Sequence, residues 1–215
     1  MSAAEQRQAV ADLAELAKRE LFRFLAGVSP ANYRAALVEV LPLLGAEYGD
    51  AAAALAADWY EEIRAANGAA GRFIAVLAGT PDAGRWESLA VWASSHSEAL
   101  ALAAGGLQRA IADQHRLTIV NSSIADPAAS GWKRVGVGDS CGWCRMLIGR
   151  GHVYTEATST FKSHDCCNCG ASPSFDPDAV KVSGEPFRQS ERLLSEAAKA
   201  ANRARAKAYI AEHYH

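Results

Sequence analysis

The first 140 residues of this 215-residue sequence contain no cysteine. The whole sequence has only two methionines, and aromatic residues make up 8% of it. Its formal net charge is −2, so no basic excess points to nucleic-acid binding over the whole surface. No run of 18 apolar residues occurs, which excludes a transmembrane helix of ordinary length.

The N-terminal residues 1–16 also lack the basic start and apolar block of a signal peptide. We therefore expect a protein of a reducing cytoplasm with no membrane partner. In that compartment, clustered cysteines more often hold a metal ion or carry out redox chemistry than form disulfides. A chain of this length can also bury a core without covalent or metal staples.

Alanine-rich helical periodicity lies on both sides of a short stretch that is punctuated by glycine. In residues 2–28, Val10, Leu13, Leu21 and Phe24 recur at helical spacing, which predicts one amphipathic helix. The whole pattern predicts a mainly α fold in three parts. These are a helical region over residues 1–126, a small α/β module over 127–183 and a C-terminal helix over 184–215.

Proline and capping residues divide the helical region. Ser29-Pro30 is expected to begin a second helix, because serine is a good N-cap and proline suits a first helical position. Pro42 is expected to kink or end that helix, because proline removes a helical hydrogen bond. Asp50 is expected to cap a third helix, which stops at Asn67-Gly68.

Two more helical segments are expected before residue 126. One is a short apolar helix over Phe73–Leu77. The other is a long segment from Trp86 to about Thr118, which Gly105-Gly106 would weaken or bend.

The middle module contains short candidate strands. WKRVGVG, residues 132–138, is β-branched and bounded by glycine, which predicts a strand, and HVY, residues 152–154, predicts a second one. Arg145–Ile148 is expected to form a helical turn between them. Residues 172–186 are rich in proline, serine and aspartate, which predicts a turn-rich exit towards the last helix.

All five cysteines and two of the six histidines lie within residues 141–170. Two C-x-x-C pairs stand 21 residues apart, and two such turns brought together can complete a tetrahedron around one ion. An H-x-x-C pair overlaps the second of them, so six candidates compete for four positions. The sequence predicts one structural zinc ion per chain. Its candidate ligands are Cys141, Cys144, Cys166, Cys169, His164 and Cys167.

Packed thiols, disulfides, redox chemistry and a protease nucleophile all account less well for the cysteine window. Buried thiols that pack as small hydrophobes would leave the adjacency of Cys166 and Cys167 unexplained, and an odd number of cysteines disfavours disulfides. CGWC as a redox motif needs a βαβ frame, whereas its surroundings are mostly helical in pattern. GDSCG is similar to the nucleophile motif of serine proteases, but the upstream His96 and His115 lie in helical pattern instead of a β-barrel.

The string WKRVGVGDSCGWCRMLIGRGHVYT, followed by F-x-x-H-D-C-C-x-C, resembles the MuF-like minor capsid (head morphogenesis) proteins of tailed bacteriophages, in particular those of actinobacterial phages. The resemblance covers about residues 131–175. The family often has histidine where this chain has Cys166, and both residue types bind zinc. The resemblance therefore favours Cys141, Cys144, Cys166 and Cys169 as the ligands. The second choice is Cys141, Cys144, His164 and Cys167.

The resemblance implies a structural protein, not an enzyme, in the capsid interior of the virion and in the host cytoplasm during assembly. Its implied partners are the portal protein and the major capsid or scaffold protein, which the helices of residues 2–125 would contact. The basic C-terminal helix would face packaged DNA or is simply solvated. Two alternatives stay open: a capsid maturation protease, and a nucleic-acid-binding zinc module.

Overall fold

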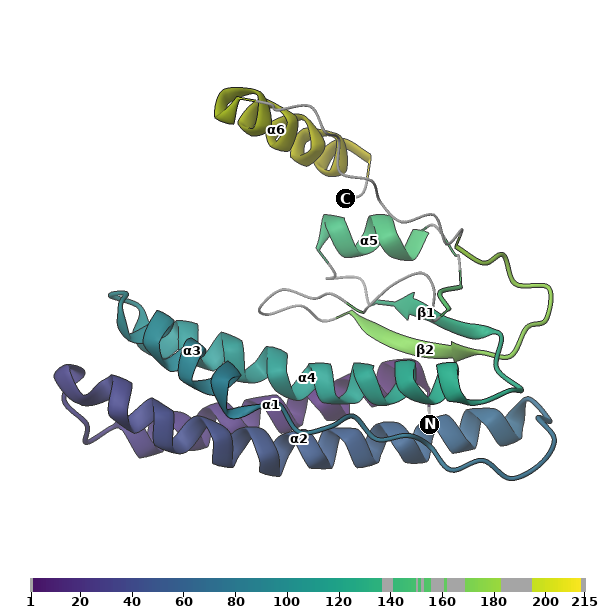
Figure 1. The fold of residues 1–215 in the computed structure, drawn as a ribbon, viewed down its shortest axis with the longest axis horizontal. Helices are drawn as coiled ribbons and strands as arrows, with labels where there is room; N and C mark the ends of the chain where they lie inside the picture. The colour runs from purple at the N-terminus through teal and green to yellow at the C-terminus, as the bar shows by residue number, and fades with distance from the viewer. Residues whose placement is uncertain are drawn as a thin grey trace.

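The computed structural model describes residues 2–136, 141–149, 151, 153–155, 161, 169–182 and 195–213. It is mainly α-helical, as the sequence predicts, with a two-stranded sheet laid against the long helices (Figure 1). The helices are α1 (Ala3–Leu25), the 3-10 turn η1 (Pro30–Asn32), α2 (Tyr33–Ala66), α3 (Ala83–Ser94), α4 (Ala99–Ala125), α5 (Gly142–Gly149) and α6 (Glu196–His213). The strands are β1 (Gly131–Val135) and β2 (Gly170–Ser174). Among these described helices, none is long and apolar enough to span a membrane.

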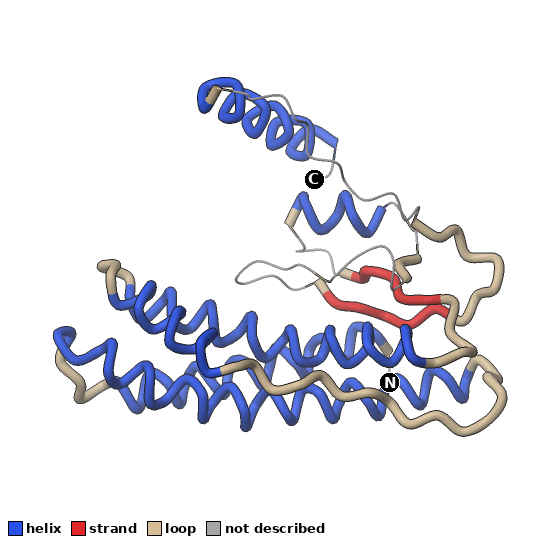
Figure 2. The backbone as a smooth tube through the Cα atoms, viewed as in Figure 1, coloured by secondary structure: helices blue, strands red, loops and turns tan. Residues whose placement is uncertain are grey.

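Helices α1, α2 and α4 run side by side as an elongated bundle, and α3 lies against one end of it (Figures 1 and 2). The core at that end consists of leucines and alanines from all four helices. Small residues allow close contact there: a Cβ on Gly45 would lie 2.1 Å from the Trp86 ring. A Cβ on Gly106 would likewise lie 2.5 Å from Leu89. Gly106, which was expected to weaken its helix, therefore serves the packing of that helix.

The prediction that Pro42 ends a helix, and that Asp50 caps another, is wrong. Helix α2 continues through both positions from Tyr33 to Ala66. An internal proline costs roughly 3 kcal/mol. The neighbouring Leu41 and Leu44 are buried in the core, and burying one leucine side chain recovers about 2 kcal/mol. Packing on α1 and α4 thus outweighs the local break signal.

The short helix predicted over Phe73–Leu77 does not form. Residues 72–82 are an irregular segment that runs along the bundle instead (Figure 2). Three of its backbone N–H groups are bound by side chains of the long helices. Ala75 donates to Glu61 at 3.0 Å, Val76 to the Ser122 hydroxyl at 2.9 Å and Ala78 to the Thr118 hydroxyl at 3.0 Å.

The long helical segment predicted from Trp86 is broken into α3 and α4 by a turn at residues 95–98. Polar side chains take over the last carbonyl groups of α3. The Ser95 hydroxyl donates to the Trp92 carbonyl at 2.7 Å, and His96 Nδ1 lies 2.7 Å from the same oxygen. Such local bonds compete with the helical ladder, and Asp82 caps the start of α3 through Arg85 N–H at 2.9 Å.

Strand β1 lies where WKRVGVG predicts a strand, but its antiparallel partner is β2. The sequence predicts a turn-rich exit there, because β2 reads GASPS and contains Pro173, which pairs with Trp132. The predicted strand HVY is reduced, within the described residues, to two single bridges, Trp132 with Tyr154 and Val153 with Lys181. Helix α5 confirms the predicted helical turn and extends it.

Helix α6 has no buried residue. Ala197 and Ala201, which were expected on its apolar side, are not buried there, and Ile210 is only partly buried. Leu193 and Leu194, which were also expected there, lie outside the described residues.

A second core forms where the sheet meets the bundle. Trp132 of β1 is fully buried and stacks on Tyr154 at 4.6 Å between ring centroids. The Tyr60 ring lies 5.9 Å from that of Phe175, just after β2. Burial and the Asp126 carboxylate raise the pKa of the Tyr60 hydroxyl, which donates to that carboxylate at 3.1 Å.

An ion pair ties the ends of α2 and α4 to the segment that leads away from them. Arg64 Nε lies 2.8 Å from Asp126 Oδ2, and the Asp126 side chain is fully buried. The other Arg64 nitrogens donate to three successive carbonyls, those of Ala69, Ala70 and Gly71. The arginine thus satisfies the turn after α2, while Asp126 accepts from Ala128 N–H at 3.0 Å.

Asp126→Asn should lower the free energy of unfolding by about 3 kcal/mol, because it leaves the Arg64 guanidinium buried without its counter-charge. Urea unfolding of the full chain measures this change. Asp50→Asn is the matched control, because Asp50 is exposed on α2, and it should change stability by less than about 0.5 kcal/mol. Equal effects of the two substitutions would contradict the role of the ion pair.

His115 should make stability depend on pH. Burial, with Arg116 adding to the effect, lowers the pKa of His115 from 6.5 to about 4, and its Nε2 lies 3.2 Å from Gln6 Oε1. The unfolded chain therefore binds a proton at this residue between pH 6.5 and 4, whereas the folded chain does not. Stability should fall as the pH drops through this window, by up to about 3 kcal/mol.

His115→Gln should flatten the loss of stability between pH 6.5 and 4, as measured by urea unfolding at a series of pH values. His96→Gln is the control, because His96 is exposed and should leave the pH profile unchanged. A His115→Gln profile as steep as that of the parent chain would show that other groups carry the dependence.

Candidate metal centre

The first C-x-x-C pair lies at the beginning of α5. Cys141 directly precedes the helix, and its carbonyl accepts from Arg145 N–H at 2.9 Å. Its Sγ accepts from the backbone N–H of Cys144 at 3.5 Å, as a capping side chain does. A helix N-terminus carries partial positive charge, so this position favours negative charge on the sulfur.

The second C-x-x-C pair is described only through Cys169, the residue before β2. Cys169 is 2% exposed and Cys144 is 1% exposed, and both belong to the core beneath the sheet. Cys141 packs against the same core. The fold therefore brings one cysteine of each pair into a single cluster, although 24 residues separate them between positions 144 and 169.

Two buried arginines surround Cys169. Arg134 of β1 donates through Nη1 to Cys169 Sγ at 3.2 Å, and Arg116 of α4 donates through Nε to the Cys169 carbonyl at 2.8 Å. The Phe161 ring lies close to both guanidinium groups, 3.9 Å from Arg134 Cζ and 5.3 Å from Arg116 Cζ. Hydrogen bonds from a charged donor favour the thiolate form of a cysteine, which is the form that binds a metal.

The position of Arg116 is itself fixed from α4. Its Nη1 lies 2.8 Å from Asp113 Oδ1, one helical turn earlier. The other oxygen of Asp113 lies 3.3 Å from Arg85 Nη2, so α3 takes part as well. Sequence reasoning missed Arg116 as part of this site, although an arginine three residues after an aspartate in an otherwise apolar helix was a usable signal.

The other predicted ligands, His164, Cys166 and Cys167, lie outside the described residues, as do Ser140 and His152 of the protease alternative. Over the described part of the chain, no three His, Cys, Asp or Glu side chains form a group that could hold a metal ion. The two histidines that the sequence placed on helices are described. His96 is exposed, whereas His115 is buried in the core and stacks on Trp59 at 6.2 Å.

The described cysteines fit a thiolate–metal site in their chemistry. Three sulfurs come from two short turns, two of the three are buried, and two receive a backbone or guanidinium donor. Such donors to coordinating sulfur orient ligands and offset the charge of a metal–thiolate centre.

Comparison with known proteins gives one match. The family model described as "VG15 protein" matches residues 1–197. A search of the curated proteins and a search of the solved structures found no match. Because the family model covers most of the sequence, from α1 to the beginning of α6, the chain belongs to the VG15 protein family, a family of viral gene products, which points to a phage protein.

Proposed function

We propose that this chain is a minor capsid (head morphogenesis) protein that acts inside the phage head as a structural component. Membership of a viral family supports a virion role, and the resemblance of residues 131–175 to MuF-like proteins supports the finer assignment. The observation that carries the proposal is a concentration of exposed apolar side chains at one end of the bundle.

That end is formed by the second half of α1, the first half of α2 and α3, away from the sheet (Figure 1). Side chains of this kind normally lie inside a protein or against a partner. We call this set the apolar end. Its members are 39–66% exposed: Leu16, Phe22, Phe24, Val38, Leu43, Val91 and Trp92.

In the proposal, the apolar end docks on the portal protein or on the major capsid or scaffold protein. Amphipathic helices commonly bind a partner by placing apolar side chains in its groove. The sheet and its cysteines lie at the other end of the bundle, so they are positioned to act as a rigid element that does not compete for the same contact.

A structural zinc ion would hold the cysteine module together in this proposal. Cys141, Cys144, Cys166 and Cys169 would supply four thiolates, and Arg134 would donate to one of them. Zinc bound by four protein ligands has no open position for water, so its contribution is to folding and rigidity.

The basic side chains of α6 provide a second contact. Lys199, Arg203, Arg205 and Lys207 are exposed, and Lys199 also pairs with Glu196 at 2.7 Å. Packaged DNA is the partner that this excess of positive charge fits inside a phage head.

Protein purified without chelator should contain about one zinc ion per chain by elemental analysis. Cys169→Ser should remove the metal and lower the thermal midpoint, because it deletes a ligand of the favoured set. Cys167→Ser is the matched control and should keep the metal. The reverse pattern would select the ligand set with His164 and Cys167, and metal-free protein with every thiol titratable in the native state would refute the zinc site.

Leu43→Ser should weaken co-purification of the chain with procapsids by about tenfold, because it removes the most exposed member of the apolar end from the contact. Its effect on unfolding should stay below about 0.5 kcal/mol, since the side chain packs little in the isolated chain. Val180→Ser is the control, because Val180 is 64% exposed beside the sheet. If Val180→Ser releases the chain and Leu43→Ser does not, the docking role belongs to the sheet end.

A further inference from the structure

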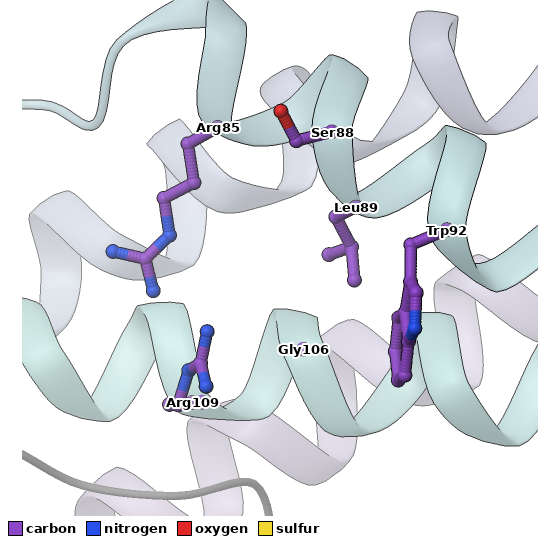
Figure 3. Close-up of a pocket in the computed structure, with 6 residues that line it drawn as sticks. All are labelled: Arg85, Ser88, Leu89, Trp92, Gly106 and Arg109. Carbon is purple, nitrogen blue, oxygen red and sulfur yellow. The ribbon is translucent and has the colours of Figure 1, made fainter. Parts of the chain in front are cut away.

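A groove of about 380 Å³ lies between α3 and α4, outside the cysteine site (Figure 3). Helix α3 supplies Arg85, Ser88, Leu89 and Trp92 to it. These residues recur at intervals of three and four, so they form one stripe about 10 Å long on the same helical face. Helix α4 supplies Gly106 and Arg109.

The floor and the aromatic wall of the groove are held in place by packing. Gly106 has no side chain, and Leu89 fills the space where its Cβ would lie. The Trp92 side chain is 42% exposed, and its ring lies 5.2 Å from the His96 ring between centroids. The indole therefore offers accessible surface from a fixed position.

The other end of the groove is cationic. The guanidinium groups of Arg85 and Arg109 extend from opposite helices towards the same space (Figure 3). The carboxylate that reaches Arg85, that of Asp113, also binds Arg116, so it serves two arginines at once. The described lining of the groove contains two arginines, one hydroxyl and no carboxylate.

We propose that this groove binds single-stranded nucleic acid, with a phosphate group between Arg85 and Arg109 and a base stacked on Trp92. Planar guanidinium groups bind phosphate through paired hydrogen bonds, and an exposed indole stacks on any base. The Ser88 hydroxyl, on the same face of α3, can donate to the sugar–phosphate backbone. The volume suits one nucleotide unit, which is within the usual range for small ligand sites.

Two features favour this ligand over an acidic protein segment. A carboxylate peptide would use the arginines but would leave the exposed Trp92 face without a flat partner. A duplex would keep its bases stacked internally, so the indole could not reach one. The inference uses neither the zinc ion nor the capsid role, so it can fail or hold independently of both.

The test is fluorescence anisotropy of a labelled oligothymidylate added to the full chain at low and moderate salt. Binding should weaken with salt, because phosphate contacts release counterions. Arg109→Gln and Trp92→Ala should each weaken binding about tenfold, through loss of a phosphate contact and of base stacking respectively. Thermal unfolding of each variant checks that the fold is kept.

Matched controls separate the groove from the rest of the surface. Arg34→Gln and Trp143→Ala change an exposed arginine and an exposed tryptophan elsewhere, and both should bind as the parent chain does. No binding by the parent chain at low salt would overturn the inference. So would polyglutamate competing as well as oligothymidylate with no effect of Trp92→Ala, or loss of binding on changing Arg203, Arg205 and Lys207 to glutamine while the groove variants still bind.

Discussion

A buried ion pair between Arg64 and Asp126 connects the helical bundle to everything that follows it. The pair closes the C-terminal ends of α2 and α4, and its arginine also holds the carbonyls of residues 69–71. Two buried charges are costly to remove from water, and this cost is offset only when both are fully hydrogen-bonded. Here the bonds serve two purposes, because the same two side chains satisfy a helix end and fix the exit of the chain towards β1.

The thiol cluster depends on that geometry at one remove. Strand β1 begins five residues after Asp126, and it places Arg134 beside Cys169. Helix α4 contributes Arg116 to the same cysteine from the bundle side. The module is therefore attached to the helices through cationic side chains and the Phe161 ring as well as through apolar packing.

The bundle separates three surfaces along its length. The apolar end lies far from the sheet, the cysteines lie beneath the sheet, and the arginine-lined groove between α3 and α4 lies at the α3 end beside Trp92. Trp92 belongs both to the apolar end and to the groove, so a docked partner and a nucleic acid would meet at this side chain. Close packing at Gly45 and Gly106 makes α3 a fixed part of that end rather than a loose attachment.

The sequence by itself determined the elements whose signal is local: α1 from its apolar period, β1 from its β-branched residues, α5 at the first C-x-x-C, and the mainly α class. Tertiary structure decided the rest. Pro42 stays inside α2 because buried leucines on either side outweigh one lost hydrogen bond. Residues 73–77 stay non-helical because Glu61 and Ser122 bind their N–H groups. β2 forms despite Pro173 because β1 and the core beneath it supply the pairing. These contacts join residues 14 to 46 positions apart, and no local pattern records them.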